Sequence, residues 1–408
     1  MALGAQARPV RRPSRNGLLL LATSIVIGIT GWILGQPELT ILAVTGALAL
    51  LGALLWVRVA PVRLEVQRGV RPARIRVGEE ARVLLRFRNT ASRGTAVLLL
   101  GDVVGHGGAD HRNGTVRLSV APIPSGATRE AGYRYPGRTR GIHTVGPLEV
   151  EVEDPFALAS SRIVLPSRAA LVVLPRTWPL DPLPSTLGDE PDDGTSATIS
   201  RSSSDEEFAS LRAYEPGDDI RRIHWRSTAR TGRLVVQQYD QPWQRRTTVV
   251  LDTRRQAHDA PSFERAVAAA ASVVELATRT GELIRLVSTD GVDSQMVSAE
   301  SNESDLLDRL ATVTVSADGS MAATMAALAP TAAGRIVVCT GTLDTVAHAG
   351  LADATRRWEL RVIVATGTVA PSADTAPPAL VHWTSATELS EAWRRGTAEL
   401  RAPFQVTP

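Results

Sequence analysis

Two long stretches without a charged residue lie close together near the start of this 408-residue chain. The first covers residues 17–34 and the second covers 39–57, with Gly35-Gln36-Pro37-Glu38 between them. As helices they would be about 27 and 28 Å long, close to the thickness of the hydrocarbon core of a bilayer. A four-residue connector allows only a tight hairpin, so the sequence predicts two transmembrane helices over 17–57. A cleaved signal peptide is the alternative for the first stretch, but the A-x-A site is missing and a second span follows closely.

The arginines around these stretches predict an orientation. A basic N-terminal tail, residues 1–16, carries Arg8, Arg11, Arg12 and Arg15, and the second stretch is followed by Arg58, Arg63, Arg68 and Arg71. The connector has no basic residue. By the positive-inside rule we expect both termini and the main body to be cytoplasmic.

Composition excludes several classes of function. The formal net charge of +3 is too small to favour a nucleic-acid binder. Every basic residue is arginine, because the sequence contains no lysine, so a P-loop lysine and a Schiff-base lysine are impossible. The single cysteine, Cys339, excludes an internal disulfide and lies in an apolar run typical of a buried strand. We therefore expect no cofactor.

Residues 58–165 are predicted to form a small antiparallel β-sandwich. Val83, Leu85 and Phe87 alternate with arginines, and Leu148, Val150 and Val152 alternate with glutamates. The Gly-rich segment 101–111 contains two Asp and two His, but their spacing fits no familiar metal site, and we expect a solvated loop. Residues 166–204 are rich in Pro, Ser and Asp, which predicts a linker.

From residue 241 to 408 the hydrophobic period changes. Apolar strands are predicted at 247–251, 283–288, 335–339 and 360–365. Helical patterns cover 262–280, 303–313, 318–329, 343–358 and 386–400. Strands that alternate with helices predict βαβ units and an α/β doubly wound sheet covered on both faces.

Between the linker and this region, residues 205–240 combine dense charge with aromatic side chains. The segment holds seven carboxylates, six arginines and four rings, Phe208, Tyr214, Trp225 and Tyr239. Pro216-Gly217 suits a type II turn, Asp218 or Asp219 suits the N-cap of a short helix to about Ala229, and Gly232 suits its end. Three interpretations remain open here: a structural ion-pair network that includes His224, a docking surface for another protein, and a catalytic carboxylate pair. The last is disfavoured, because neighbouring arginines would hold both acids ionised.

The run EFASLRAYEPGDDIRRIHWRSTARTGRLVVQQYD within this segment resembles the signature of the bacterial DUF58 family. The motifs Arg140-Gly141, Gly146-Pro147-Leu148 and Asp154-Pro155-Phe156, with the two apolar stretches, also resemble its membrane-anchored members. That resemblance implies the plasma membrane of a bacterium, and partners among MoxR-type AAA+ ATPases and transglutaminase-like membrane proteins. It implies no established reaction.

The resemblance also implies that the 241–408 region is a von Willebrand factor A-like domain, whose first strand is followed by D-x-S-x-S at a divalent-cation site. Here the corresponding residues are Asp252-Thr253-Arg254-Arg255-Gln256, so both serine positions are lost, to Arg254 and Gln256. A guanidinium repels a cation and donates where an acceptor is needed. Our hypothesis is that Arg254 replaces the cation and pairs with Asp252, with Asp290 or Asp344 as further partners.

We therefore expect a membrane-anchored scaffold or adaptor without enzymatic activity that binds other proteins and the lipid bilayer. The alternative is a metal-dependent adhesion or hydrolytic module that uses Asp252. The docking interpretation assigns partner binding to Phe208, Arg212, Tyr214, Gly217, Asp218, Asp219, Arg221, Arg222, Trp225 and Arg230.

Overall fold

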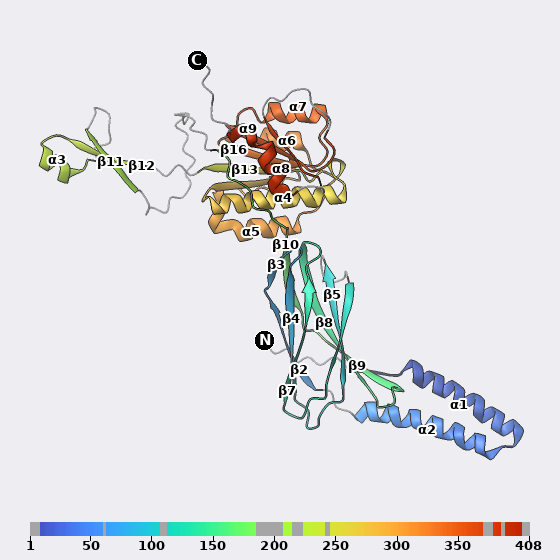
Figure 1. Cartoon of the computed structure of the whole chain (residues 1–408). Helices are drawn as coiled ribbons and strands as arrows, with labels where there is room; N and C mark the ends of the chain where they lie inside the picture. The colour runs from blue at the N-terminus through green and yellow to red at the C-terminus, as the bar shows by residue number, and fades with distance from the viewer. Residues whose placement is uncertain are drawn as a thin grey trace. The chain divides into compact units, whose positions relative to one another are not determined.

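A computed structural model of the chain describes residues 9–59, 63–106, 112–184, 207–213, 223–240, 245–369, 378–384 and 388–401. These residues form two compact units. The first contains the chain up to Arg176 together with Ser304–Thr314, and the second contains Thr177–Glu303 and the chain from Val315 onward (Figure 1). The chain is multi-domain, as expected.

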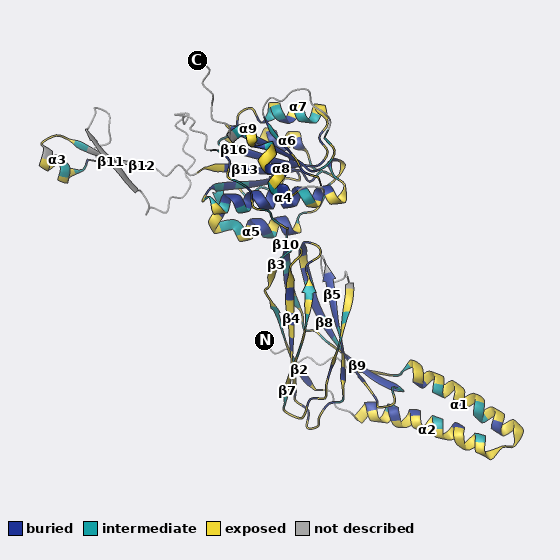
Figure 2. Ribbon diagram, viewed as in Figure 1, coloured by how far each residue is buried: buried dark blue, intermediate teal, exposed yellow. Residues whose placement is uncertain are grey.

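Two apolar helices lead the first unit. The side chain of Ser14 accepts a hydrogen bond from the Gly17 N–H at 3.1 Å and caps α1 (Arg15–Leu34). Gly35, in the left-handed region at φ 62°, ends α1, and α2 (Pro37–Val59) begins two residues later. The connector is therefore shorter than the four residues expected, because proline is well suited to the first turn of a helix. Both helices are long and apolar enough to cross a membrane, and Figure 2 shows most of their surface exposed.

Small residues let the two helices approach each other closely. A Cβ added at Gly46 of α2 would lie 2.2 Å from Ser24 Oγ of α1. A Cβ at Gly28 would lie 3.3 Å from the Cβ of Ala43, and one at Gly31 would lie 2.8 Å from the Cβ of Leu39. Close backbone packing through small side chains is how helices associate in a bilayer, where apolar burial gives little driving force.

Substitution of Gly46 with leucine is expected to separate the helices and to cost about 1–3 kcal/mol, as overpacking does elsewhere. Gly52 is the matched control, because it lies in the same helix and a Cβ there meets nothing within 4 Å. Both substitutions raise helix propensity equally, so the difference between them reports packing. The measurement is the thermal midpoint of the full chain in detergent micelles. Equal midpoints for Gly46→Leu and Gly52→Leu would contradict the interface.

The rest of the first unit is mainly two β-sheets. The seven-stranded sheet contains β1 (Val10–Pro13), β9 (Ala159–Leu165), β8 (Gly141–Glu153), β10 (Ala169–Leu174), β3 (Arg74–Arg76), β5 (Leu98–His106) and β6 (Arg112–Val120). The three-stranded sheet has the order β2 (Leu64–Arg71), β4 (Glu80–Asn89), β7 (Thr128–Pro136). Neighbouring strands are antiparallel except for β10 and β3, which are parallel.

The predicted alternation in these strands is confirmed. Val83, Leu85 and Phe87 of β4 are fully buried, and the residues between them are exposed. Leu85 and Phe87 share one apolar cluster with side chains of β5 and β8 from the other sheet. The two sheets therefore face each other across a common core, which is the expected sandwich.

The structure corrects two domain boundaries. The tail predicted at residues 1–16 contains β1, which pairs with β9 so that Val10 lies opposite Arg162 and Pro13 lies opposite Ala159. The linker predicted at 166–204 begins with β10, a strand of the sandwich. Within the same segment, Trp178 belongs to the second unit, where its ring contacts Trp383 at a centroid distance of 4.8 Å. Residues 185–204 lie outside the described part of the chain.

The glycine-rich segment 101–111 is not the loop we expected over its first half. Residues 101–106 belong to β5, and Asp102 is fully buried. Its carboxylate accepts two hydrogen bonds from Arg68, Nη1 to Oδ2 at 2.5 Å and Nη2 to Oδ1 at 2.8 Å. The Tyr133 hydroxyl donates a third at 2.7 Å. Residues 107–111 lie outside the described part.

The second unit is built on a six-stranded sheet. Its order is β15 (Val297–Ser298), β14 (Leu283–Ser288), β13 (Arg246–Leu251), β16 (Arg335–Thr340), β17 (Leu360–Ala365), β18 (Ala379–His382). All neighbours are parallel except β15, which runs against β14. The four long strands are those predicted, and the short edge strands β15 and β18 were missed because two to four residues give no readable period.

Helices lie between the strands and after the last of them. They are α4 (Ala260–Arg279), α5 (Ala299–Thr312), α6 (Met321–Leu328), α7 (Thr345–Ala354), α8 (Leu389–Gly396) and α9 (Ala398–Arg401), and residues from Ser304 to the end of α5 belong to the first unit. Side chains of α6 and α7 share an apolar cluster with Val250, Ile336 and Ile363 of the sheet, while α4 contacts four of its strands. Figure 1 shows α6 and α7 on one side of the sheet and α4 on the other. The sheet is therefore doubly wound.

Candidate functional site

The charged segment contains a β-hairpin. Strands β11 (Glu207–Ala213) and β12 (Val235–Asp240) pair antiparallel, with Arg212 opposite Val236, and α3 (Trp225–Thr231) lies between them in the chain (Figure 1). Of the ten residues assigned to partner binding, Tyr214, Gly217, Asp218, Asp219, Arg221 and Arg222 lie outside the described residues. For Phe208 and Arg212 only the backbone is described. Trp225 and Arg230 are both on α3.

The helix begins later than we predicted. Ile223 is buried in an isolated β-bridge and His224 has non-helical backbone angles, so a helix cannot run from Asp218 or Asp219 through these residues. His224 is instead the N-cap, because its Nδ1 accepts the Ser227 N–H at 3.2 Å. The structure thus gives this histidine a capping role where we expected a member of an ion-pair network. Gly232 ends the helix at φ 69°, as predicted.

Large side chains on and beside α3 are open to solvent. Trp225 is 64% exposed, Leu234 is 43% exposed, and Arg226 and Arg230 are also exposed. We call these four residues the α3 face. An exposed tryptophan among arginines is uncommon on a surface that meets only water, and these are the residue types enriched at protein interfaces.

The second candidate site lies where β13 ends. Parallel strands β14 and β16 flank β13 on either side, and the chain passes from one side of β13 to the other at this point, so the carboxyl end of β13 is the switch point of the sheet. Asp252 follows β13 directly and its carboxylate is completely buried.

The guanidinium of Arg254 forms a bidentate hydrogen-bonded pair with this carboxylate. Nε donates to Oδ1 at 2.9 Å and Nη2 donates to Oδ2 at 2.8 Å. The Arg254 N–H also donates to Oδ1, and the Thr340 hydroxyl donates to Oδ2 at 2.8 Å. These four donors fill the directions from which a cation would be bound.

The predicted pairing of Arg254 with Asp252 is confirmed, and its pairing with the two further acids is not. In the described part of the chain Asp290 accepts a hydrogen bond from Ser288, and Asp344 caps α7 by accepting the Ala347 N–H at 2.7 Å. Neither bonds to Arg254. Gln256 lies exposed in a short 3-10 helix, Arg255–Ala257. The described residues contain no group of three or more His, Cys, Asp or Glu that could hold a metal.

Electrostatics keep this pair charged. Burial raises the pKa of Asp252, but the hydrogen bonds from Arg254 and Thr340 and the positive charge of Arg254 outweigh it, so the pKa is lowered from its ordinary value. The hydrogen bond to Asp252 raises the pKa of Arg254. Burial lowers the pKa of the nearby His258, whose Nε2–H donates to the Asp252 carbonyl oxygen at 2.8 Å. A neutral histidine therefore orders the turn after β13.

Sequence reasoning missed a set of threonines at this edge. Thr253, Thr289, Thr340 and Thr366 end or follow four parallel strands and are all buried. Thr289 Oγ1 accepts the Thr253 N–H at 2.8 Å, and Thr366 Oγ1 donates to the Thr340 carbonyl oxygen at 3.0 Å. The recurrence of threonine at successive strand ends was the available signal. Hydroxyls and the Asp252–Arg254 pair thus close the carboxyl edge with satisfied hydrogen bonds.

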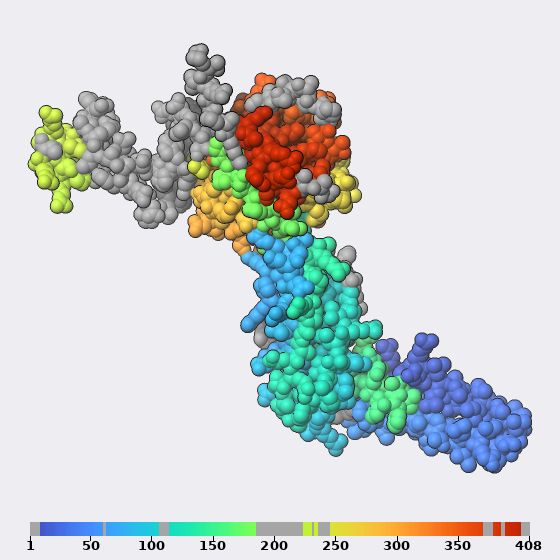
Figure 3. All heavy atoms as spheres, in the orientation of Figure 1, coloured from blue at the N-terminus to red at the C-terminus, as the bar shows by residue number. Residues whose placement is uncertain are grey.

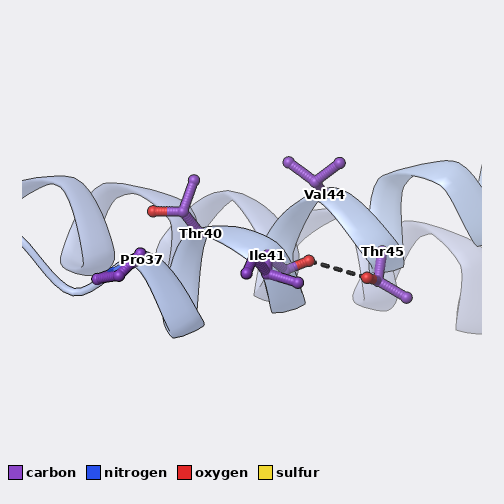
Figure 4. A pocket seen from close by; sticks show the side chains of 5 residues that line it. All are labelled: Pro37, Thr40, Ile41, Val44 and Thr45. Carbon is purple, nitrogen blue, oxygen red and sulfur yellow. Dashed lines mark hydrogen bonds between the residues drawn. The ribbon is translucent and has the colours of Figure 1, made fainter.

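A shallow hollow of about 380 Å³ lies on α2 and is lined by Pro37, Thr40, Ile41, Val44 and Thr45 (Figure 4). Its hydroxyls are turned back onto their own helix, since Thr45 Oγ1 donates to the Ile41 carbonyl oxygen at 2.8 Å. The hollow therefore presents an apolar surface, as suits a helix in lipid.

Comparison with known proteins gives one family. Residues 210–379 match the family described as protein of unknown function DUF58. No curated protein matches.

Solved structures are similar only over parts of the chain. The alkylpurine DNA glycosylase AlkC of Pseudomonas fluorescens is 16% identical over 38% of this chain and 45% of its own, with a TM-score of 0.21. A CARDB domain of Pyrococcus furiosus is 10% identical over 28% of this chain and 88% of its own, with a TM-score of 0.19. The putative ApaA protein of Bordetella pertussis is 15% identical over 27% and 92%, also at 0.19. At these TM-scores the matches carry no argument.

Proposed function

Because residues 210–379 belong to the DUF58 family, of unknown function, we propose that this chain is a membrane-anchored scaffold or adaptor that binds another protein through the α3 face and catalyses no reaction itself. The observation that carries the proposal is the exposure of Trp225, at 64%, beside the exposed guanidinium groups of Arg226 and Arg230. Tryptophan and arginine are the residues that most often dominate binding energy at interfaces.

Helices α1 and α2 are the proposed membrane anchor. Their apolar length and exposed surface support insertion, and the arginines on both outer flanks support an orientation with both termini and both units in the cytoplasm. The small-residue contact between the helices supports a two-pass hairpin rather than a single span with a peripheral helix.

The proposed partner is a MoxR-type AAA+ ATPase or its client, with a transglutaminase-like membrane protein as a further member of the assembly. The resemblance to membrane-anchored DUF58 proteins supports this choice. The charge of the α3 face supports it as well, because two exposed arginines around an indole suit an acidic patch on the partner.

A von Willebrand factor A-like interpretation of the second unit is part of the proposal. The doubly wound parallel sheet and the aspartate after its central strand support it. In such a domain the guanidinium of Arg254 would stand where a divalent cation is otherwise bound, which favours a binding module over a metal-dependent adhesion or hydrolytic one.

Replacement of Trp225 with alanine is expected to weaken partner binding by about 2 kcal/mol, or roughly thirtyfold in Kd, because a central aromatic contact is lost. The full chain is used to capture proteins from native membranes, a MoxR-type ATPase is identified by mass spectrometry, and its affinity for wild type and variant is measured with purified components. Arg230→Ala is expected to act in the same direction with a smaller effect.

Two controls lie in the same unit. Val346 on α7 is 82% exposed, and the side chain of Arg356 is 75% exposed, so Val346→Ala removes an exposed apolar group and Arg356→Ala an exposed guanidinium from another surface. Equal affinity for Trp225→Ala and Val346→Ala, with both variants folded, would show that the α3 face is not the docking surface.

A further inference from the structure

The turn between β8 and β9 presents an aromatic side chain on a rigid support. Phe156 is 78% exposed, while Asp154 two residues earlier is buried. The Asp154 carboxylate accepts the Phe156 N–H at 2.9 Å and the Ala159 N–H at 2.6 Å. Ala157 is held at φ 54°, a conformation that residues with a side chain rarely adopt. The ring is therefore held out into solvent by a tight, hydrogen-bonded turn.

This turn is bonded to the start of α1. The Ser14 N–H donates to the Leu158 carbonyl oxygen at 2.8 Å, and the Ser14 hydroxyl donates to the Ala157 carbonyl oxygen at 2.5 Å. A Cβ at Gly17 would lie 2.1 Å from the same Leu158 oxygen, so the turn and the first turn of α1 are in direct contact.

The same turn also contacts the end of α2. Ala53 and Val57 of α2 share an apolar cluster with Ala159, against which Leu158 packs. The turn therefore sits at the base of the hairpin, where α1 begins and α2 ends.

Helix length places that base in a membrane. The 20 residues of α1 are about 30 Å long, which equals the thickness of the hydrocarbon core. If α1 spans the bilayer, Ser14 lies at one surface of the core, and the turn bonded to it lies among the headgroups. Exposed Trp32 is near the opposite end of α1, and half-exposed Trp56 is near the base, as in the aromatic belts of membrane proteins.

Charge around the base fits the same position. Arg12 of β1, Arg15 of α1 and Arg58 of α2 are all exposed. Guanidinium groups at this level meet lipid phosphates, and the attraction is stronger on an anionic surface.

We propose that the turn Asp154–Leu158 is a third membrane contact, in which Phe156 inserts into the headgroup layer of the bilayer that α1 and α2 cross. An aromatic ring favours this layer because it is partly apolar and partly hydrated. Together with the hairpin, this contact holds the β-sandwich in one orientation against the membrane surface. The inference rests on the proposed membrane anchor.

The test labels position 156 with an environment-sensitive fluorophore. The chain needs only Phe156→Cys, because Cys339 is fully buried and burial raises the pKa of its thiol to about 12. The full chain is reconstituted into vesicles of phosphatidylcholine and phosphatidylglycerol, with and without lipids that carry a doxyl quencher near the headgroup. We expect the label at 156 to lose more than half of its emission to the quencher.

Arg138→Cys is the matched control. Arg138 is exposed in the same unit, just before β8, and the 13 residues of β8 separate it from the turn by about 40 Å. A label there is expected to keep its emission. An equal loss of emission to the quencher at the two positions, in chains that resist alkaline extraction, would overturn the membrane contact. The proposed anchor would be unaffected by that result. Extraction of the chain by alkali would overturn the anchor, and the contact with it.

Discussion

Replacement of Asp102 with alanine is expected to destabilise the β-sandwich by about 3–5 kcal/mol, the range for breaking a buried ion pair from one side. The side chain of Arg68 is 2% exposed and that of Asp102 is 0% exposed. Removal of the carboxylate leaves a guanidinium without its counter-charge in the core and deprives the Tyr133 hydroxyl of its acceptor. Burial, and then the negative charge of Asp102, raise the pKa of Tyr133, so this hydroxyl stays protonated and needs an acceptor.

The measurement is hydrogen exchange of the full chain, followed by mass spectrometry of peptides from β4 and β5. The matched control is Glu130→Ala, which breaks the Arg86–Glu130 pair of the same sandwich, with N–O distance 3.1 Å and both side chains more than half exposed. That change is expected to stay within about 0.5 kcal/mol. Arg68→Met combined with Asp102→Leu should recover much of the loss, because no charge then remains buried. Equal protection in Asp102→Ala and Glu130→Ala would contradict the role of the pair.

Sequence periodicity predicted the sandwich well where one face of a strand is apolar. In β4 every second residue is buried. In β8 the alternation changes phase between Val145 and Gly146, and after that point Leu148, Val150 and Val152 are buried as predicted. The buried pair Arg68–Asp102 was missed, although the alternation of apolar residues in each strand places both charged residues on the inward face. Arg68 is in step with Leu64 and Val66, and Asp102 is in step with Leu98 and Leu100. Opposite charges that face inward from two strands imply that the two side chains pair with each other. We missed this because the glycines around Asp102 favoured a loop.

The switch-point site was predicted more fully than the charged segment. A strand followed by Asp252 and then Arg254 places a carboxylate and a guanidinium two residues apart on one turn, so local geometry alone was enough to pair them. The start of α3 depends instead on the N-cap His224, whose Nδ1 accepts the Ser227 N–H and whose own N–H donates to the Val235 carbonyl oxygen at 2.8 Å. A histidine N-cap and a bond to the following strand decided that boundary, and a turn motif alone could not.

Replacement of Arg254 with methionine is expected to destabilise the second unit by about 3 kcal/mol at neutral pH, the lower end for a buried pair because the Arg254 side chain is a quarter exposed. Methionine keeps the apolar stem and removes the charge. The Asp252 carboxylate then remains fully buried, with the Thr340 hydroxyl and the backbone N–H of residue 254 as its nearest remaining donors. The measurement is a denaturant midpoint followed by tryptophan fluorescence, since Trp358, Trp383 and Trp393 are all buried in this unit.

The pH dependence of stability gives a sharper test, because the contribution of Asp252 to stability changes with pH in opposite directions in the wild type and in Arg254→Met. In the wild type the pKa of Asp252 is lowered, so its contribution to stability is present above the ordinary pKa of an aspartate and is lost as pH falls through the lowered value. In Arg254→Met burial dominates and the pKa is expected to rise. The folded variant then binds the proton more tightly than the unfolded chain, so its stability falls as pH rises between the ordinary and the raised pKa. The deficit relative to wild type should therefore be smaller near pH 4 than near pH 7.

Two further variants separate charge from packing at this site. Asp252→Asn combined with Arg254→Met removes both charges and should be less sensitive to pH than Arg254→Met alone. Arg395→Met breaks an exposed pair with Glu391, at 3.0 Å, in the same unit and is expected to have almost no effect. Because hydrogen-bond donors already surround the Asp252 carboxylate, magnesium should not stabilise the wild type. A magnesium-dependent rise in the denaturant midpoint of the wild type that disappears in Asp252→Asn would contradict this expectation. It would show that the carboxylate binds the metal and that the Arg254 guanidinium is displaced.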